Sequence, residues 1–255
     1  MNILWLSANK LGYELLKEAS KIKGFNIGAI ITLKENTKTV MYDGVPVNKW
    51  SKFNCNLFEI ERIEDESNLI KKISPEIIVV CGWRQIIPEN ILRIPKLGVF
   101  GFHPSLLPYG RGSAPIINSI RNGDKEMGLT FFRLTKGLDD GAIITQERFF
   151  VNKGNHADDI YKKIIWAGKK IVRKTFSELV LGKILLKDQD HSKAFVFSKP
   201  KLTDNKIDLE KESMEEVFRK IKAFTKPYRG AYIQKDDKRL IIWRAELVEG
   251  IDDNV

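Results

Sequence analysis

The sequence predicts an α/β fold, in which a Rossmann-like domain with a mostly parallel sheet is followed by a small β-rich C-terminal domain. Three observations lead to this prediction. Short apolar runs alternate with helical patterns through the first half of the chain. The composition, 43% hydrophobic and 30% charged, is that of a globular protein. The pattern changes after about residue 190, so we expect a catalytic domain over 1–190 and a separate domain over 191–255.

The alternating segments of the first half are assigned from their composition and period. The strand-like runs are rich in Ile and Val and almost continuously apolar, which is typical of strands buried on both faces of a parallel sheet. The predicted strands are 2–7, 25–33, 76–81 and 98–102. The predicted helices are 12–22, 65–73, a short helix opened by Pro88, and 114–122.

The remaining elements follow the same reasoning. Residues 127–134 and 143–151 predict two paired strands around the loop 135–140. Asn155 precedes apolar residues at helical spacing, so we expect it to cap a helix that ends near Gly182. The expected C-terminal elements are a helix over 214–224 and strands over 231–234 and 240–245.

The bulk composition limits the classes of function. The formal net charge is +10, but residues 191–255 hold 14 Lys and Arg against 12 Asp and Glu, so no dense basic arm is present. No apolar run is long enough to span a bilayer, and the N-terminus lacks the pattern of a secretion signal. Cys55 and Cys81 are too few for a disulfide framework and fit no metal-ligand spacing. We therefore expect a cytoplasmic protein without a membrane segment or a metal site.

A histidine stands where a strand is predicted to end. His103 follows the strand 98–102, and ligands of open parallel sheets bind at that edge. Pro104 restricts His103 to an extended conformation, and Gly110 and Gly112 allow a tight loop behind it. Because histidine ionises near neutral pH, it suits general base catalysis. The alternative is a histidine that only bonds backbone groups.

A second chemical feature is the segment KGLDDGAII. Asp139 and Asp140 lie between two glycines, just before a predicted strand. A carboxylate in such a loop can orient a nearby imidazole and stabilise its charge. The alternative is a surface turn, since Asp and Gly are common turn residues.

The segment HPSLLPYGRGSAPI, followed by GLDDGAII, closely resembles the signature of the 10-formyltetrahydrofolate-dependent formyltransferases. That family includes glycinamide ribonucleotide transformylase, methionyl-tRNA formyltransferase and sugar N-formyltransferases. The core match covers about residues 75–150, and the tail KAFTKPYRGAYIQKDDKRLIIWRAEL resembles the C-terminal domain of the sugar and methionyl-tRNA branches. The match is weakest around 34–65.

The resemblance implies roles for particular residues. His103 would assist removal of a proton from the acceptor amine, and Asp139 would orient His103 and help pass the proton to the folate nitrogen. The segment GWRQII matches the loop that holds the pterin, with Leu107 lining the same region. The implied contacts with 10-formyltetrahydrofolate are Trp83, Arg84, Gln85, Ile86, Ile87, Leu106 and Asp140. The expected contacts with the acceptor are Lys10, Ser105, Tyr109, Arg111, Lys226 and Tyr228, with Phe224 and Tyr232 as further stacking candidates.

One position departs from the family pattern. The family usually has asparagine two residues before the histidine, where it donates a hydrogen bond to the oxyanion, and this chain has Gly101. Loss of one such donor typically costs about 10²–10³ in rate. Another side chain or a water replaces it, the acceptor geometry differs, or the chain binds without catalysing. We favour the first because His103 and Asp139 are both present.

Three functions compete for this sequence. The first is formylation of an amino group on a nucleotide-linked deoxyamino sugar, by an enzyme whose branch implies a homodimer. The second is formylation of methionyl-tRNA, and the third is a non-catalytic folate- or nucleotide-binding module. Two observations disfavour methionyl-tRNA as the acceptor. The C-terminal charge is nearly balanced, and the loop after the second strand has only two basic residues, Lys34 and Lys38. The tail favours the sugar branch, although Arg229 replaces a proline that is common there.

Overall fold

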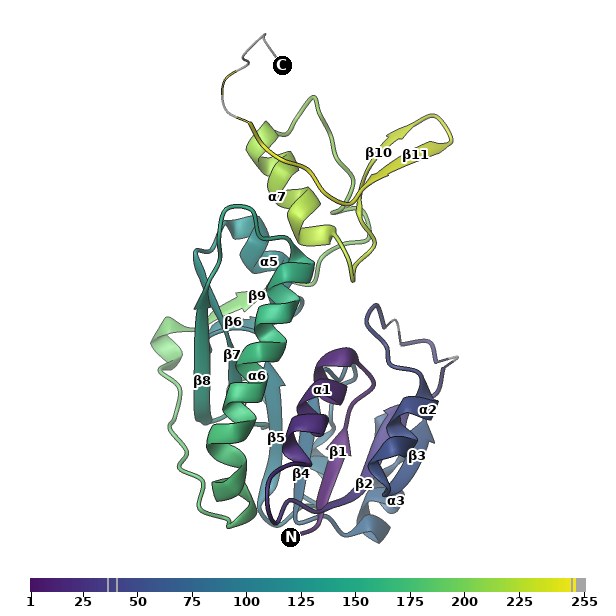
Figure 1. The fold of residues 1–255 in the computed structure, drawn as a ribbon, viewed down its shortest axis with the longest axis vertical. Helices are drawn as coiled ribbons and strands as arrows, with labels where there is room; N and C mark the ends of the chain where they lie inside the picture. Colours follow the sequence, from purple (N-terminus) through teal and green to yellow (C-terminus); the bar gives the residue numbers. More distant parts are fainter. Residues whose placement is uncertain (36, 40, 249, 251–255) are drawn as a thin grey trace.

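The chain folds around a mostly parallel sheet, as a computed structural model of residues 1–35, 37–39, 41–248 and 250 shows (Figure 1). Within that part of the chain, the sheet has seven strands in the order β3-β2-β1-β4-β5-β7-β8. Their bounds are Asn56–Ile60, Ile27–Leu33, Ile3–Leu6, Ile77–Cys81, Gly98–His103, Glu126–Arg133 and Ile143–Phe150. The first five are mutually parallel, and β7 and β8 are antiparallel to their neighbours. The predicted fold class is confirmed.

Helices cover both faces of the sheet, and the alternation of side chains along each strand explains why. In β1, Ile3 and Trp5 face one hydrophobic core, whereas Leu4 and Leu6 face the other. The first core is closed by α1 (Lys10–Ala19), α5 (Pro115–Asn122) and α6 (Ala157–Val180). The second is closed by α3 (Ser67–Ile73) and α4 (Glu89–Leu92). No helix in the described residues is both long and apolar enough to cross a bilayer.

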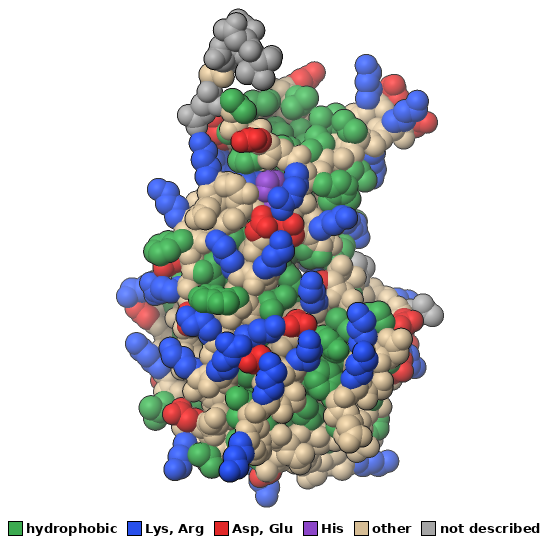
Figure 2. Space-filling model, in the orientation of Figure 1, with side chains coloured by type: hydrophobic (Ala, Val, Ile, Leu, Met, Phe, Trp, Pro, Cys, Tyr) green, Lys and Arg blue, Asp and Glu red, His purple; other side chains and the backbone are tan. Residues whose placement is uncertain are grey.

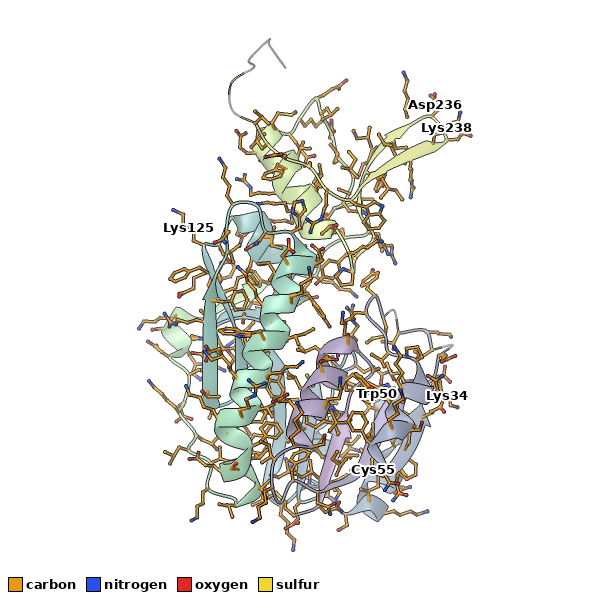
Figure 3. All side chains as sticks on the ribbon, viewed as in Figure 1. Lys34, Trp50, Cys55, Lys125, Asp236 and Lys238 are labelled. Atoms are coloured by element: carbon orange, nitrogen blue, oxygen red, sulfur yellow. The ribbon has the colours of Figure 1, made fainter. Side chains whose placement is uncertain are left out.

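The region after β2 contains elements that the sequence did not predict. They are α2 (Val47–Trp50), the 3-10 helices η1 (Ser51–Phe53) and η2 (Ile63–Asp65), and the edge strand β3. The fully buried Trp50 anchors this region behind α1, and its ring lies 5.3 Å from that of Tyr13 (Figure 3). Strand β3 was missed because its burial is mixed, as expected for an edge strand.

The prediction that Asn155 caps α6 was wrong by one residue. The cap is His156, which has extended dihedral angles, and its backbone N–H donates to the Asp159 carboxylate at 3.2 Å. The Asn155 side chain instead accepts from the backbone N–H of Asn152 at 2.9 Å and closes the preceding turn. Asparagine suits both positions, so composition alone did not separate them.

The C-terminal region builds a small hydrophobic core of its own. Helix α7 (Met214–Phe224) packs against α5 and the hairpin β10 (Ala231–Lys235) and β11 (Lys238–Ile242). The last strand therefore lies earlier than the predicted 240–245. The connection from α6 runs through η3 (His191–Lys193) to β9 (Phe195–Phe197), which pairs with β6 (Tyr109–Gly112). The domain boundary at residue 190 stays a prediction, since β9 lies beyond it and pairs with a strand before it.

Candidate active site

The carboxyl ends of three neighbouring strands bring the candidate residues together. Asn9 follows β1, Gly82 follows β4, and His103 ends β5. Because β1 and β4 are neighbours that lead to opposite halves of the sheet, a crevice is expected at their ends. A Cβ placed on Gly82 would lie 2.1 Å from the Asn9 side chain, so only glycine permits this close approach.

The imidazole of His103 is buried and is hydrogen-bonded through one of its ring nitrogens. Nε2 lies 2.7 Å from the carbonyl oxygen of Gly110, and Nδ1 lies 3.6 Å from Oδ2 of Asp139. A carbonyl oxygen only accepts hydrogen bonds, so Nε2 carries the proton in this arrangement. In that tautomer the lone pair is on Nδ1, on the side of the ring that faces the Asp139 carboxylate.

Asp139 stands in a tightly closed loop. Its φ of 48° lies in the left-handed region, which Asp tolerates better than most residues. Its carboxylate accepts from the backbone N–H of Gly112 at 2.8 Å. A Cβ on Gly141 would lie 1.9 Å from the Arg133 carbonyl oxygen, so the loop closes only with glycine there. The paired carboxylate and imidazole can accept and hold one proton.

Gln189 supports this loop, and no pattern in the sequence identified it. Its side-chain amide donates to the carbonyl oxygens of Asp139 and Gly141 at 2.9 and 2.7 Å. Its Oε1 accepts from Nε and Nη2 of Arg111 at 3.1 and 2.7 Å. Arg111, predicted to contact the acceptor, is buried behind the loop and also bonds His191. A single glutamine in a polar segment carries no local signal for such a role.

The loop after His103 is fastened to the adjacent antiparallel strands. The buried hydroxyl of Thr130 donates to the Ser105 carbonyl oxygen at 2.7 Å and accepts from the Leu107 N–H at 3.2 Å. Leu106 packs over Gly128, where a Cβ would lie 2.4 Å from Leu106 Cδ2. The Ser105 hydroxyl is buried without a hydrogen-bond partner among the described residues.

In the loop after β4, some side chains bond or pack within the protein and others are exposed. Gln85 bonds the backbone of Glu61 and Ile63, at 2.7 and 2.8 Å, and Ile87 belongs to the second core. Ile86 is 91% exposed and Arg84 is partly exposed, so these two side chains are open to a ligand. Trp83 packs against the second core, and its indole N–H is buried without a partner in the described residues.

The other predicted contacts lie around this edge with differing exposure. Asp140 bonds the Thr135 hydroxyl, and the exposed Lys226 lies over the Trp243 ring at 5.6 Å. The Tyr109 hydroxyl donates to the Asp124 carboxylate, and Lys10 is exposed at the start of α1. The ring of Tyr228 lies beside that of Tyr42. Phe224 and Tyr232 are buried and present no open ring for stacking.

The space next to His103 at position 101 is filled. Gly101 and His103 lie two apart on β5 and therefore face the same side of the sheet. A Cβ on Gly101 would lie 2.3 Å from Cδ1 of Leu134. An apolar side chain thus occupies the place into which a residue at position 101 would project.

A second polar cluster lies beyond the carboxyl ends of β1 and β2. The Asp43 carboxylate accepts from Asn9 Nδ2 at 2.9 Å and from the hydroxyl of Tyr161, which itself accepts from the Leu11 N–H. Burial, and then the neighbouring Asp43 charge, raise the pKa of Tyr161 well above its ordinary value. Tyr161 is therefore a permanent donor to Asp43. The sequence analysis did not identify Asp43 or Tyr161.

Comparison with known proteins agrees with this geometry. Residues 15–176 match the formyl transferase family model and residues 200–254 match its C-terminal domain. The chain is 34% identical over 236 residues to the methionyl-tRNA formyltransferase of Mycoplasmopsis pulmonis, covering 88% of this chain and 78% of that protein. It is 30% identical over 250 residues to the bifunctional polymyxin resistance protein ArnA of Wigglesworthia glossinidia brevipalpis, covering 97% of this chain but only 38% of ArnA.

A solved sugar N-formyltransferase from a Shewanella species shares the fold. Its TM-score is 0.76 at 20% identity, with 98% of this chain and 99% of that chain covered. The family model spans more than half of the sequence and includes the segment that holds His103 and Asp139. The chain therefore belongs to the formyl transferase family.

Proposed function

We propose that the protein transfers a formyl group from 10-formyltetrahydrofolate to the amino group of a nucleotide-linked deoxyamino sugar. The observation that carries the transfer step is the His103–Asp139 pair. It places a free ring nitrogen beside a carboxylate at the carboxyl edge of the sheet. General base catalysis of this kind contributes about 10²–10⁴ in rate.

The reaction forms one carbon–nitrogen bond and breaks another. The acceptor amine attacks the formyl carbon, and Nδ1 of His103 takes the proton that the amine loses. Asp139 stabilises the resulting imidazolium across 3.6 Å, while Gly110 keeps the ring in place through Nε2. His103 then returns the proton to the departing folate nitrogen. The protein thus moves one proton between two nitrogens, with no net change in its own protonation.

The residues around His103 fit a folate donor. The donor supplies the activated formyl carbon. The loop after β4, which begins at Gly82, offers backbone groups and the exposed side chain of Ile86. A pterin ring, which is planar and rich in hydrogen-bonding groups, matches such a lining. Solved relatives from this family carry the same ligand class, since one from Helicobacter canadensis is described in complex with folinic acid and dTDP-3-aminofucose.

The distribution of charge supports a small acceptor. On the face drawn in Figure 2, Lys and Arg side chains are spread over the surface with acidic side chains between them. Affinity for tRNA needs many cations gathered along the phosphate backbone. A nucleotide-linked sugar needs only a few donors at one place.

The direct test is a formyl-transfer assay with 10-formyltetrahydrofolate and UDP- and dTDP-linked amino sugars, followed by mass spectrometry. One product should gain one formyl group, and His103→Ala or Asp139→Asn should lower turnover about 10²–10⁴-fold without loss of folding. Wild-type turnover in either variant would refute the catalytic assignment. Folate binding without any product would instead support a binding module.

Methionyl-tRNA is the second candidate acceptor, because the Mycoplasmopsis relative is a methionyl-tRNA formyltransferase. This candidate predicts tight tRNA binding that weakens steeply as salt is added. Filter binding of methionyl-tRNA at about 50 and 200 mM salt, the range over which phosphate contacts weaken, separates the two acceptors. Weak binding with a shallow salt dependence would remove the tRNA candidate.

A further inference from the structure

Two arginines border the ring of Tyr42. The guanidinium carbon of Arg84 lies 5.2 Å from the ring centroid, and that of Arg229 lies 5.6 Å from it. The ring of Tyr228 meets the same ring edge-on at 5.8 Å. The loop after β2, the loop after β4 and the C-terminal region therefore meet at Tyr42.

Asp43, the residue after Tyr42, anchors this meeting point. Its side chain is 6% exposed, and Oδ2 is bonded by Asn9 and Tyr161. Its Oδ1 is buried without a hydrogen-bond partner among the described residues and lies 3.9 Å from Nη2 of Arg84. Asp43 thus attracts Arg84 by charge, with no hydrogen bond between the two side chains.

Positive charge exceeds negative charge around the Tyr42 ring. Arg84 has one carboxylate nearby, and Arg229 has none within salt-bridge distance in the described part of the chain. Each guanidinium is attracted to the Tyr42 ring, and the two like charges repel each other. An anion that contacts both guanidinium groups would offset this repulsion and accept charge-assisted hydrogen bonds from both.

We propose that Tyr42, Arg84 and Arg229 form a subsite for the diphosphate of the acceptor, which we call the Tyr42 subsite. The proposal rests on the proposed function, since it names the part of the nucleotide-linked sugar that this edge binds. Arg84 lies three residues beyond the end of β4, and His103 ends β5, which pairs with β4. The subsite and the reacting amine thus border the same crevice.

A diphosphate fits the subsite better than the single carboxylates of a folate tail. It carries two linked charged centres, which match two guanidinium groups contributed by separate segments. Arg229 belongs to the C-terminal region, so the subsite also gives that region a part in binding the acceptor. Inorganic pyrophosphate and 5-formyltetrahydrofolate are the probes that separate these two sources of negative charge.

The test measures the affinity of both probes by isothermal titration for the wild type, Arg84→Gln and Arg229→Gln. The matched control is Arg239→Gln, which removes the same charge and the same kind of stacking, since Arg239 lies 4.7 Å from the Tyr232 ring. Arg239 is next to Lys238, which Figure 3 labels at the outer end of the β10–β11 hairpin, away from the crevice. Thermal unfolding of each variant checks that it is folded.

The expected result is that each crevice variant binds pyrophosphate at least about tenfold more weakly than the wild type, because each loses a hydrogen bond to a charged group. Arg239→Gln should bind it like the wild type, and in Arg229→Gln the affinity for 5-formyltetrahydrofolate should not change. Unchanged pyrophosphate affinity in both crevice variants, or no binding by the wild type, overturns the proposal. Weaker binding of 5-formyltetrahydrofolate alone also overturns it, in favour of a folate tail.

The formyl-transfer assay separates failure of this proposal from failure of the proposed function. Arginine-dependent pyrophosphate binding with no transfer to any nucleotide-linked amino sugar would retain the Tyr42 subsite and reject the proposed reaction. Transfer with normal kinetics in both crevice variants would retain the reaction and reject the subsite. Transfer with a raised KM in those variants would support both.

Discussion

The chemistry of His103 depends on the groups next to its ring and on the residue at position 101. Nε2 is hydrogen-bonded to a carbonyl oxygen and Nδ1 lies beside a carboxylate, so the two ring nitrogens have different roles. Leu134 fills the neighbouring space that position 101 would enter. The oxyanion of the proposed reaction therefore meets no side-chain donor from position 101, and the imidazolium of His103 carries more of that charge than it would beside an asparagine.

We expect asparagine at position 101 to raise turnover only if the Leu134 side chain is also shortened. Gly101→Asn forces an overlap with Leu134, and overpacking typically costs about 1–3 kcal/mol. We expect a lower unfolding midpoint and no gain in turnover for this variant. The double variant Gly101→Asn with Leu134→Ala should recover most of the midpoint and raise turnover, by up to about 10²-fold if the amide reaches the oxyanion.

Leu134→Ala alone is the control, because it opens the space without adding a donor. The unfolding free energies of the wild type, the two single variants and the double variant give a coupling energy. This energy isolates the contact between positions 101 and 134. If Gly101→Asn alone folds normally and turns over faster, Leu134 does not block the position.

At the scale of elements, the connection that follows α6 completes the site. Helix α6 packs closely on α1, since a Cβ on Gly168 would lie 2.6 Å from Leu15 Cδ2. The chain then returns past the Asp139 loop, where Gln189 bonds two carbonyl oxygens, and pairs through β9 with β6. The loop that carries Asp139 is thus clamped from a segment some 50 residues away, which local sequence patterns do not reveal.

Gln189→Leu should test this clamp. It leaves the buried Gly141 carbonyl oxygen, the partly buried Asp139 carbonyl oxygen and the buried Arg111 without their partner, and an unsatisfied buried group costs about 1–3 kcal/mol. We expect a lower unfolding midpoint and turnover at least about tenfold lower, with a smaller change in folate affinity. Gln189→Glu keeps the acceptor for Arg111 and loses the donors, so it separates support of the loop from support of Arg111. Wild-type turnover in a folded Gln189→Leu variant would contradict a positioning role.

For the molecule as a whole, stability depends on how the helices join over the sheet. The large first core includes Phe102, Phe131 and Phe176, whose rings contact one another between the sheet and α6. Ion pairs add to this contact at its rim, where Glu18 of α1 meets Arg173 of α6 at 2.6 Å. Hydrogen bonds from Arg173, and then from Lys21, lower the pKa of the Glu18 carboxyl below its ordinary value.

The lowered pKa gives a signed prediction for global stability. A carboxyl whose pKa is depressed by folding stabilises the folded state above its unfolded pKa, and this contribution is lost as the pH falls through the folded pKa. At neutral pH, Glu18→Gln should lower the thermal midpoint by about 2–4 °C. The difference from the wild type should shrink below about pH 4, where glutamate protonates. The exposed Glu178→Gln is the matched control, and an equal pH dependence in it would contradict the assignment.

Much of the fold could be predicted from local patterns. Apolar runs with buried-strand composition marked β1, β2, β4 and β5, and helical spacing marked α1 and α6. Strand β3 and α2 were not predicted because an edge strand and a single helical turn carry little periodic signal. The cap of α6 was misplaced by one residue because Asn155 and His156 both adjoin the turn.

By itself, the sequence determined the α/β class, the place of His103 at a strand end and the glycine-bounded carboxylates of the next loop, because each follows from the chain within a few residues. Only the tertiary structure decided which ring nitrogen of His103 is free, that Gln189 clamps the Asp139 loop, and that Arg84 and Arg229 share the ring of Tyr42. These contacts join segments far apart in the chain. Their formation depends on the closure of the sheet and the packing of α6 and the C-terminal region, and no local periodicity encodes that packing.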